Sequence, residues 1–128
     1  MEWAVPIPGW NTPMLIDEGD KILASVRRLY EAEYPRFFVG VVEAATETVV
    51  RVFGSVYIWD AYRNAVVKRE GQRRKLIPFS SPHFIVHCLE RDQNLEAIAF
   101  KADTNGRIWL TDGDTPLMEL AERAGSAH

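Results

Sequence analysis

One stretch, residues 48–59 (TVVRVFGSVYIW), limits the fold of this 128-residue chain more than any other. Most of its residues are β-branched or aromatic, the types that suit the pleated surface of a strand. Side chains alternate between the two faces of a strand. One face would carry aliphatic residues suited to a core: Val50, Val52, Val56 and Ile58. Gly54 in mid-strand predicts a bulge, a bend or a close backbone approach.

Further strands are predicted on both sides of this stretch. Apolar runs bounded by turn residues predict them at 37–42, 65–69, 74–79, 83–89, 95–102 and 107–111. The Asn105-Gly106 pair between two such runs predicts a hairpin with a type I′ turn, in which both positions need positive φ. Residues 70–73 are expected to close another hairpin between 65–69 and 74–79.

Two helices are expected to flank these strands. Thr12-Pro13 is a good helix start, apolar residues follow at helical spacing up to Tyr30, and Pro35 would end the helix. Thr115-Pro116 repeats the start signal, and Gly125 would end a short second helix.

The predicted fold class is therefore α+β. An N-terminal helix precedes an antiparallel meander sheet, or a partly closed barrel of six to seven strands, and a short C-terminal helix follows. This order of elements is similar to that of a pleckstrin-homology-like barrel, although no motif points to a particular family. Residues 12–125 are expected to form one domain, with a tail at 126–128.

The first eleven residues form a separate apolar, proline-containing arm. Pro6, Pro8 and Gly9 exclude helix and strand interiors, whereas Trp3 and Trp10 make the arm too apolar to be left in solvent. We expect the arm to pack along the domain. The alternative is that it docks on a partner or a second subunit.

Composition excludes several functional classes. The formal net charge of −3 gives no general attraction to nucleic acid or to anionic membranes, so nucleic-acid binding is not expected. No run approaches the ~20 apolar residues of a membrane-spanning helix. The single cysteine, Cys88, cannot form an internal disulfide, which favours a reducing, cytoplasmic setting.

No motif for catalysis, a cofactor or a metal is recognised. His83 and His87 would lie about 13 Å apart on a strand, too far to chelate one ion unaided. Neighbouring His87 and Cys88 would point to opposite faces and could not form a nucleophile–base pair. Asp112-Gly113-Asp114 lacks the other ligands of a calcium loop. We expect neither cofactor nor metal, and a non-enzymatic protein is favoured over an enzyme.

A basic cluster is the most specific local signal. Five of the fifteen basic residues fall within eight positions: Lys68, Arg69, Arg73, Arg74 and Lys75. Arginine matches phosphate and carboxylate geometry. The first hypothesis is a small non-enzymatic binding or regulatory module whose basic hairpin engages an acidic protein surface or a phosphate-bearing ligand. The alternative is a solvated hairpin tip whose charges protect an edge strand from aggregation.

An aromatic face of the sheet gives a second hypothesis. Four residues are predicted to lie opposite the core positions: Tyr57, Trp59, His87 and Trp109. They could line the pocket of a small-molecule-binding protein or an enzyme, with His87 as a catalytic group. Packing is the favoured explanation of such a face, through the arm, a barrel interior or a homodimer interface.

Overall fold

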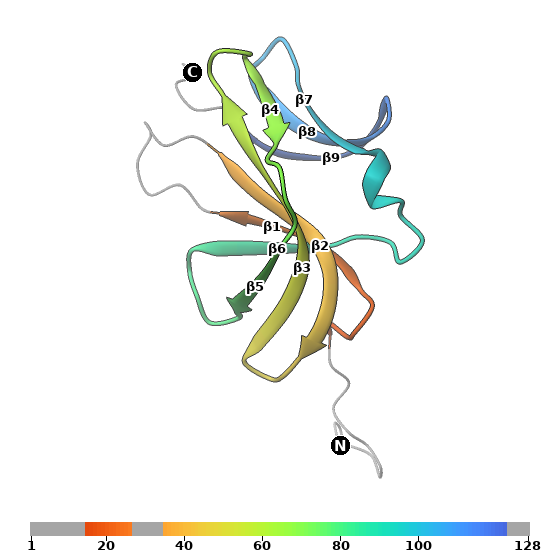
Figure 1. Cartoon of the computed structure of the whole chain (residues 1–128). Helices are drawn as coiled ribbons and strands as arrows, with labels where there is room; N and C mark the ends of the chain where they lie inside the picture. Colours follow the sequence, from red (N-terminus) through yellow and green to blue (C-terminus); the bar gives the residue numbers. More distant parts are fainter. Residues whose placement is uncertain (1–14, 27–34, 123–128) are drawn as a thin grey trace, which may run out of the picture.

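The computed structural model describes residues 15–26 and 35–122 (Figure 1), and these residues form antiparallel β structure. Nine strands lie in this part of the chain: β1 (Lys21–Val26), β2 (Arg36–Ala45), β3 (Val49–Asp60), β4 (Ala65–Lys68), β5 (Arg73–Pro78), β6 (Phe84–Cys88), β7 (Ile98–Ala102), β8 (Arg107–Asp112) and β9 (Thr115–Glu122). One short 3₁₀ turn, η1 (Leu95–Ala97), precedes β7.

The α+β prediction is wrong, because the described residues contain no α-helix. Where the N-terminal helix was expected, Gly19 adopts a φ of +92° within a turn, and β1 follows it. Successive residues of β1 are buried in two different cores, so the strand is apolar on both faces. An apolar run of this kind also matches helical spacing, which is why the sequence predicted a helix here. Residues 12–14 and 27–34 of the predicted helix lie outside the described part.

The C-terminal helix is replaced by β9, which pairs with β8. Gly113, at a φ of +61°, lies in the turn between the two strands. Thr115 and Pro116 therefore begin a strand, because pairing and burial override the helix-start signal. Without this helix, the similarity to a pleckstrin-homology-like barrel no longer holds.

The strands form two sheets. The larger sheet has the order β4-β3-β2-β1-β6, with β5 also paired to β3, and the smaller has the order β7-β8-β9. β4 pairs with Tyr57–Asp60 and β5 with Val49–Gly54. They therefore lie end to end along one edge of β3. This corrects the predicted hairpin at residues 70–73, because β4 and β5 pair with β3 and not with each other.

Two apolar cores result from this arrangement. The first, called the inner core, lies on the face of the large sheet formed by β1, β2, β3 and β5: Ile16, Ile22, Ala24, Phe38, Val42, Val50, Val52, Val56 and Ile77, with Phe84 and Val86 of β6 packed against it. β5 and β6 are at opposite edges of the sheet. Their shared cluster shows that the sheet curls around the inner core.

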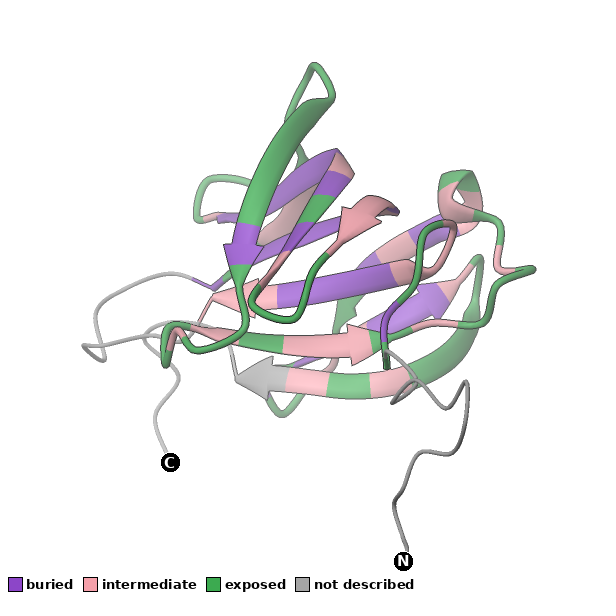
Figure 2. Cartoon of the chain, turned by 90° about the horizontal axis from the view of Figure 1, so that it is seen from below, coloured by how far each residue is buried: buried purple, intermediate pink, exposed green. Residues whose placement is uncertain are grey.

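The second core, called the interlayer core, joins the two sheets: Leu23, Phe37, Val39, Tyr57, Trp59, Ile98, Phe100, Ile108 and Leu110. The Phe100 ring lies 4.8 Å from that of Phe37 and 4.7 Å from that of Tyr57, between ring centroids. Figure 2 shows buried segments on several strands, whereas the connections and most of β5 are exposed. The predicted faces of β3 are confirmed, but the aromatic face is covered by the smaller sheet.

The predicted arm at residues 1–11 and the predicted tail at 126–128 lie outside the described part of the chain.

Candidate functional site

A pocket of about 370 Å³ opens beside the inner core. Seven apolar residues line it: Val26, Phe37, Phe38, Val56, Ile58, Ile77 and Phe84. Four basic residues complete the lining: Arg36, Arg69, Arg73 and Lys75. We call this feature the basic pocket. Its lining combines strands β1, β2, β3, β5 and β6, so the curl of the large sheet creates it.

The break between β4 and β5 brings two of the arginines, Arg69 and Arg73, to the basic pocket. Lys68 lies opposite Tyr57 and Arg73 opposite Gly54, so four residues, 69–72, face only two residues of β3. The Arg69 backbone N–H donates to the Val56 carbonyl at 2.8 Å, which holds the first residue of the insertion against β3. The insertion is an enlarged bulge, a feature that redirects side chains at the edge of a sheet.

Strand alternation places the third cation on the same side. Arg73, Lys75 and Ile77 are two residues apart along β5, and all three line the basic pocket. The Lys75 Nζ lies 5.3 Å from the centre of the Phe38 ring, within the range of a cation–π contact. Lys75 therefore connects the charged rim to the apolar lining.

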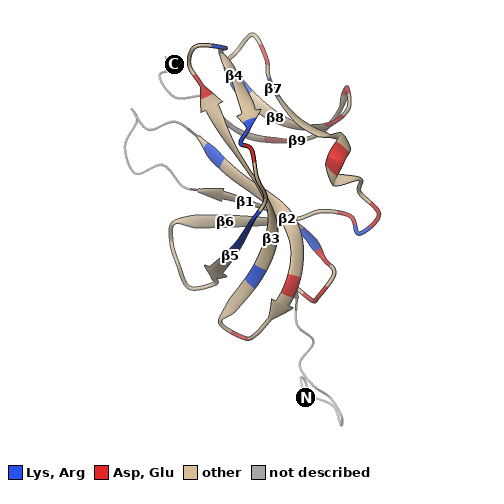
Figure 3. Ribbon diagram, in the orientation of Figure 1, with Lys and Arg blue, Asp and Glu red and all other residues tan. Residues whose placement is uncertain are grey.

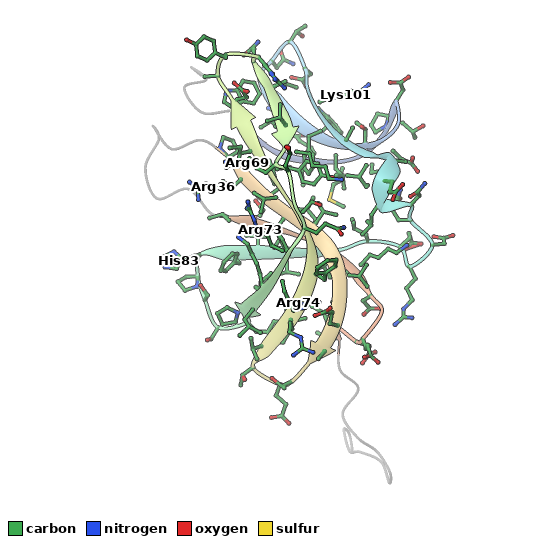
Figure 4. All side chains as sticks on the ribbon, viewed as in Figure 1. Arg36, Arg69, Arg73, Arg74, His83 and Lys101 are labelled. Atoms are coloured by element: carbon green, nitrogen blue, oxygen red, sulfur yellow. The ribbon has the colours of Figure 1, made fainter. Side chains whose placement is uncertain are left out.

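The fourth cation comes from a distant part of the sequence. Arg36 begins β2 opposite Ile58 of β3. Figure 4 shows Arg36, Arg69 and Arg73 on the same side of the molecule, and Figure 3 shows basic residues at the start of β2 and along β5. Sequence reasoning missed Arg36 because only the pairing register of β2 and β3 reveals its position.

These four cations lack nearby carboxylates in the described part of the chain. The ion pairs formed there use other basic residues, and none involves Arg36, Arg69, Arg73 or Lys75. All four are exposed. Among the described residues, the mouth of the pocket therefore carries positive charge that no ion pair neutralises, on a chain whose net charge is negative.

The other two predicted basic residues lie elsewhere. Arg74 points away from the basic pocket, donates to Glu43 at 2.7 Å and lies 5.0 Å over the Phe53 ring. The hydrogen bond from Arg74 lowers the pKa of Glu43, with help from Arg51. Lys68 lines a separate pocket of about 130 Å³ that also contains Gly40 and Gly54. The predicted cluster is thus divided between two faces of the sheet.

The predicted aromatic pocket maps to several environments. Tyr57 and Trp59 are buried in the interlayer core, where burial raises the pKa of Tyr57. Trp109 donates its indole N–H to the Asp103 carboxylate at 3.0 Å. His87 on β6 is half-buried, and burial lowers its pKa. None of these four residues lines the basic pocket.

Residues 15–26 and 35–122 hold neither a clustered set of metal ligands nor a membrane-spanning helix. No group of three or more His, Cys, Asp or Glu residues there is arranged to hold a metal ion. No helix in these ranges has the length and apolar character needed to cross a bilayer.

Comparison with protein-family models, with curated proteins and with solved structures gives no match for this chain.

Proposed function

We propose that this protein is a binding module that holds a small anionic ligand, through a phosphate or carboxylate group, in the basic pocket. The supporting observation is the convergence of Arg36, Arg69, Arg73 and Lys75 on one apolar pocket whose described lining residues include no acidic side chain. Arginine offers planar pairs of donors for such groups, and lysine adds a point charge.

The position of the charges favours binding over simple protection of an edge strand. Protective charges need only project from the edge into solvent. Arg74, on the outer face of β5, is neutralised by Glu43. In contrast, Arg73 and Lys75 face the pocket and repel each other and their neighbours. A bound anion would relieve this repulsion.

The concave shape favours a small ligand over a broad acidic protein surface. A volume of about 370 Å³ falls within the usual ~300–1,000 Å³ of small-molecule sites. The eleven described residues of the lining offer charge and apolar surface, so the proposal is one of binding. A reducing, cytoplasmic setting is part of the proposal, supported by the single exposed Cys88 thiol.

An acidic protein partner is the second candidate. Leu76 is 67% exposed and Phe79 is 40% exposed beside the basic residues of β5, which gives this edge both charge and apolar surface. Such a partner would contact Leu76, whereas a ligand inside the basic pocket would not. Binding that is lost in Leu76→Ser but kept in Arg69→Ala would favour the protein partner.

Inorganic phosphate tests the small-ligand proposal directly. Thermal unfolding would be followed during phosphate titration at low and high salt, in wild type and in Arg69→Ala/Arg73→Ala. A ligand at a hundred times its Kd adds about 2.7 kcal/mol of stability, which raises the Tm by several degrees. We expect a salt-sensitive rise in wild type that is absent in the double variant.

The matched control is Arg63→Ala/Lys101→Ala, which removes the same charge from exposed residues outside the pocket. It should retain the wild-type rise. Equal rises in all three proteins would show that phosphate acts on net charge and not through the basic pocket.

A further inference from the structure

The lining of the basic pocket is divided into two kinds of side chain. Seven of its eleven residues are apolar, one of which, Phe37, packs its ring in the interlayer core, and the other four are cationic. In residues 15–26 and 35–122, no neutral hydrogen-bonding side chain such as Ser, Thr, Asn or Gln belongs to this lining. Such a lining can recognise charge and apolar surface, but it offers few partners for uncharged polar groups.

The two kinds of side chain also differ in exposure. Phe38, Val56 and Ile77 belong to the inner core and are between 1% and 9% exposed. The four cations are exposed at the mouth. Lys75, whose Nζ lies 5.3 Å from the Phe38 ring centre, marks the boundary between the two zones.

From this division we infer that the ligand is an amphiphilic anion with a compact apolar body and a single phosphate or carboxylate head. The head binds the cations at the mouth, and the body contacts the apolar lining. This inference rests on the proposed function, because it specifies the ligand of the same pocket.

Polyhydroxylated anions fit the lining poorly. Sugar phosphates and inositol phosphates would press hydroxyl groups against apolar side chains, where each unpaired hydroxyl carries a desolvation cost. Inorganic phosphate has the head but no body, so it gains nothing from the apolar lining. Both are expected to bind more weakly than an anion with an apolar body.

The size of the pocket limits the body of the ligand. A volume of about 370 Å³ lies near the lower end of the range for small-molecule sites. A short alkyl chain or one aromatic ring is the expected body. A long acyl chain would extend beyond the apolar lining and gain little from its additional carbons.

The critical experiment compares n-propyl phosphate with glycerol 3-phosphate by isothermal titration of the wild-type protein. The two compounds differ by two hydroxyl groups and carry nearly equal charge at pH 8, because the second pKa of a phosphate monoester is about 6. We expect n-propyl phosphate to bind at least tenfold more tightly. From n-propyl to n-hexyl phosphate, affinity should rise by up to about fourfold per methylene buried.

Two variants locate the head and the body. Arg69→Ala should weaken n-hexyl phosphate and inorganic phosphate alike. Phe84→Ala should weaken n-hexyl phosphate and leave inorganic phosphate unchanged. Hexanoate carries a carboxylate head in place of the phosphate head of n-hexyl phosphate. Whichever of the two compounds binds more tightly has the preferred head group, and either result agrees with an amphiphilic anion.

The outcomes separate this inference from the proposed function. Equal affinity for n-propyl phosphate and glycerol 3-phosphate would overturn the amphiphilic ligand while leaving an anion site in place. Failure of every anion to bind would overturn both. Binding of neutral n-hexanol as tight as that of n-hexyl phosphate would also contradict both, because the cations would then contribute nothing. The propyl–glycerol comparison needs no variant, so it holds even if Phe84→Ala does not fold.

Discussion

Gly40 of β2 and Gly54 of β3 lie directly opposite each other, and neither position has room for a side chain. A Cβ atom built on Gly54 would lie 1.9 Å from the Val39 carbonyl oxygen, and one on Gly40 would lie 2.4 Å from that of Phe53. This close backbone approach is where the two longest strands pack against each other. It accompanies the curl that creates the inner core and the basic pocket.

Gly54→Ala is expected to destabilise the protein by about 3 kcal/mol or more, because the obstructing atoms are backbone and cannot rotate away. Urea unfolding followed by circular dichroism measures the change. Gly113→Ala is the matched control: its φ is +61° and nothing lies within 4 Å of the added Cβ. It should cost only the ~1–2 kcal/mol of a left-handed backbone. Equal losses in both variants would contradict the close approach.

Phe100→Ala is expected to cost about 3–5 kcal/mol, the usual range for removing a buried aromatic side chain. Phe100 is 7% exposed and its ring contacts both Phe37 and Tyr57, so its loss weakens the contact between the two sheets. Tyr62→Ala removes an aromatic ring that is fully exposed and should change the free energy of unfolding by less than about 0.5 kcal/mol. Similar unfolding midpoints for the two variants would show that the interlayer core contributes little.

The sequence predicted the strands β2 to β8 because their signals are local, but it predicted helices in place of β1 and β9. Alternation placed Val50, Val52, Val56 and Ile58 on one face of β3, and the structure packs all four against the inner core. Gly54 predicted a bulge, a bend or a close backbone approach, and the structure shows the close approach. Helix signals failed because a Thr-Pro pair and an apolar stripe describe local preference. Pairing with β2, β6 and β8 overrides that preference.

The basic pocket could be predicted only in part. Charge density in the sequence identified Arg69, Arg73 and Lys75, but it could not separate them from Arg74, which faces Glu43. That separation depends on the end-to-end placement of β4 and β5. Arg36 joins the site through the pairing of β2 with β3, a long-range register that no local pattern specifies.

Asp103 is expected to make the free energy of unfolding decrease at acid pH. Its carboxylate accepts hydrogen bonds from the Trp109 indole and from the backbone N–H groups of Asn105 and Arg107. The Trp109 bond is the largest cause that lowers the pKa of Asp103 below its ordinary 3.8. Because the folded-state pKa is lowered, this stabilisation is present above pH 3.8 and is lost as the pH falls through the folded value.

Trp109→Phe removes the indole donor and keeps the carboxylate, so the pKa of Asp103 should rise toward 3.8. NMR titration of the Asp103 side chain measures it, and acid unfolding should then begin at higher pH than in wild type. An unchanged Asp103 pKa in Trp109→Phe would contradict this role of the indole.

The hydrogen bonds that Asp103 accepts from the backbone N–H groups of Asn105 and Arg107 also hold the turn at Asn105-Gly106. Gly106 has a φ of +82° but Asn105 does not have a positive φ, so the predicted hairpin is confirmed and its type I′ turn is wrong.

Deleting Gly71 and Gln72 tests the end-to-end placement of β4 and β5. Residues 69–72 face two residues of β3, so the deletion removes the excess and keeps every flanking side chain on its own face. We expect the free energy of unfolding to change by less than about 1 kcal/mol, since a shorter exposed connection costs little.

Deletion of Asn105 and Gly106 is the control, because these residues turn the chain between β7 and β8, which do pair with each other. Their loss should abolish the hydrogen bond between the Gly106 N–H and the Asp103 carbonyl and destabilise the smaller sheet. Equal losses of unfolding free energy in the two deletions would contradict the end-to-end placement of β4 and β5. Residues 69–72 would then have to form the turn of a hairpin, and Arg69 and Arg73 would not both line the basic pocket.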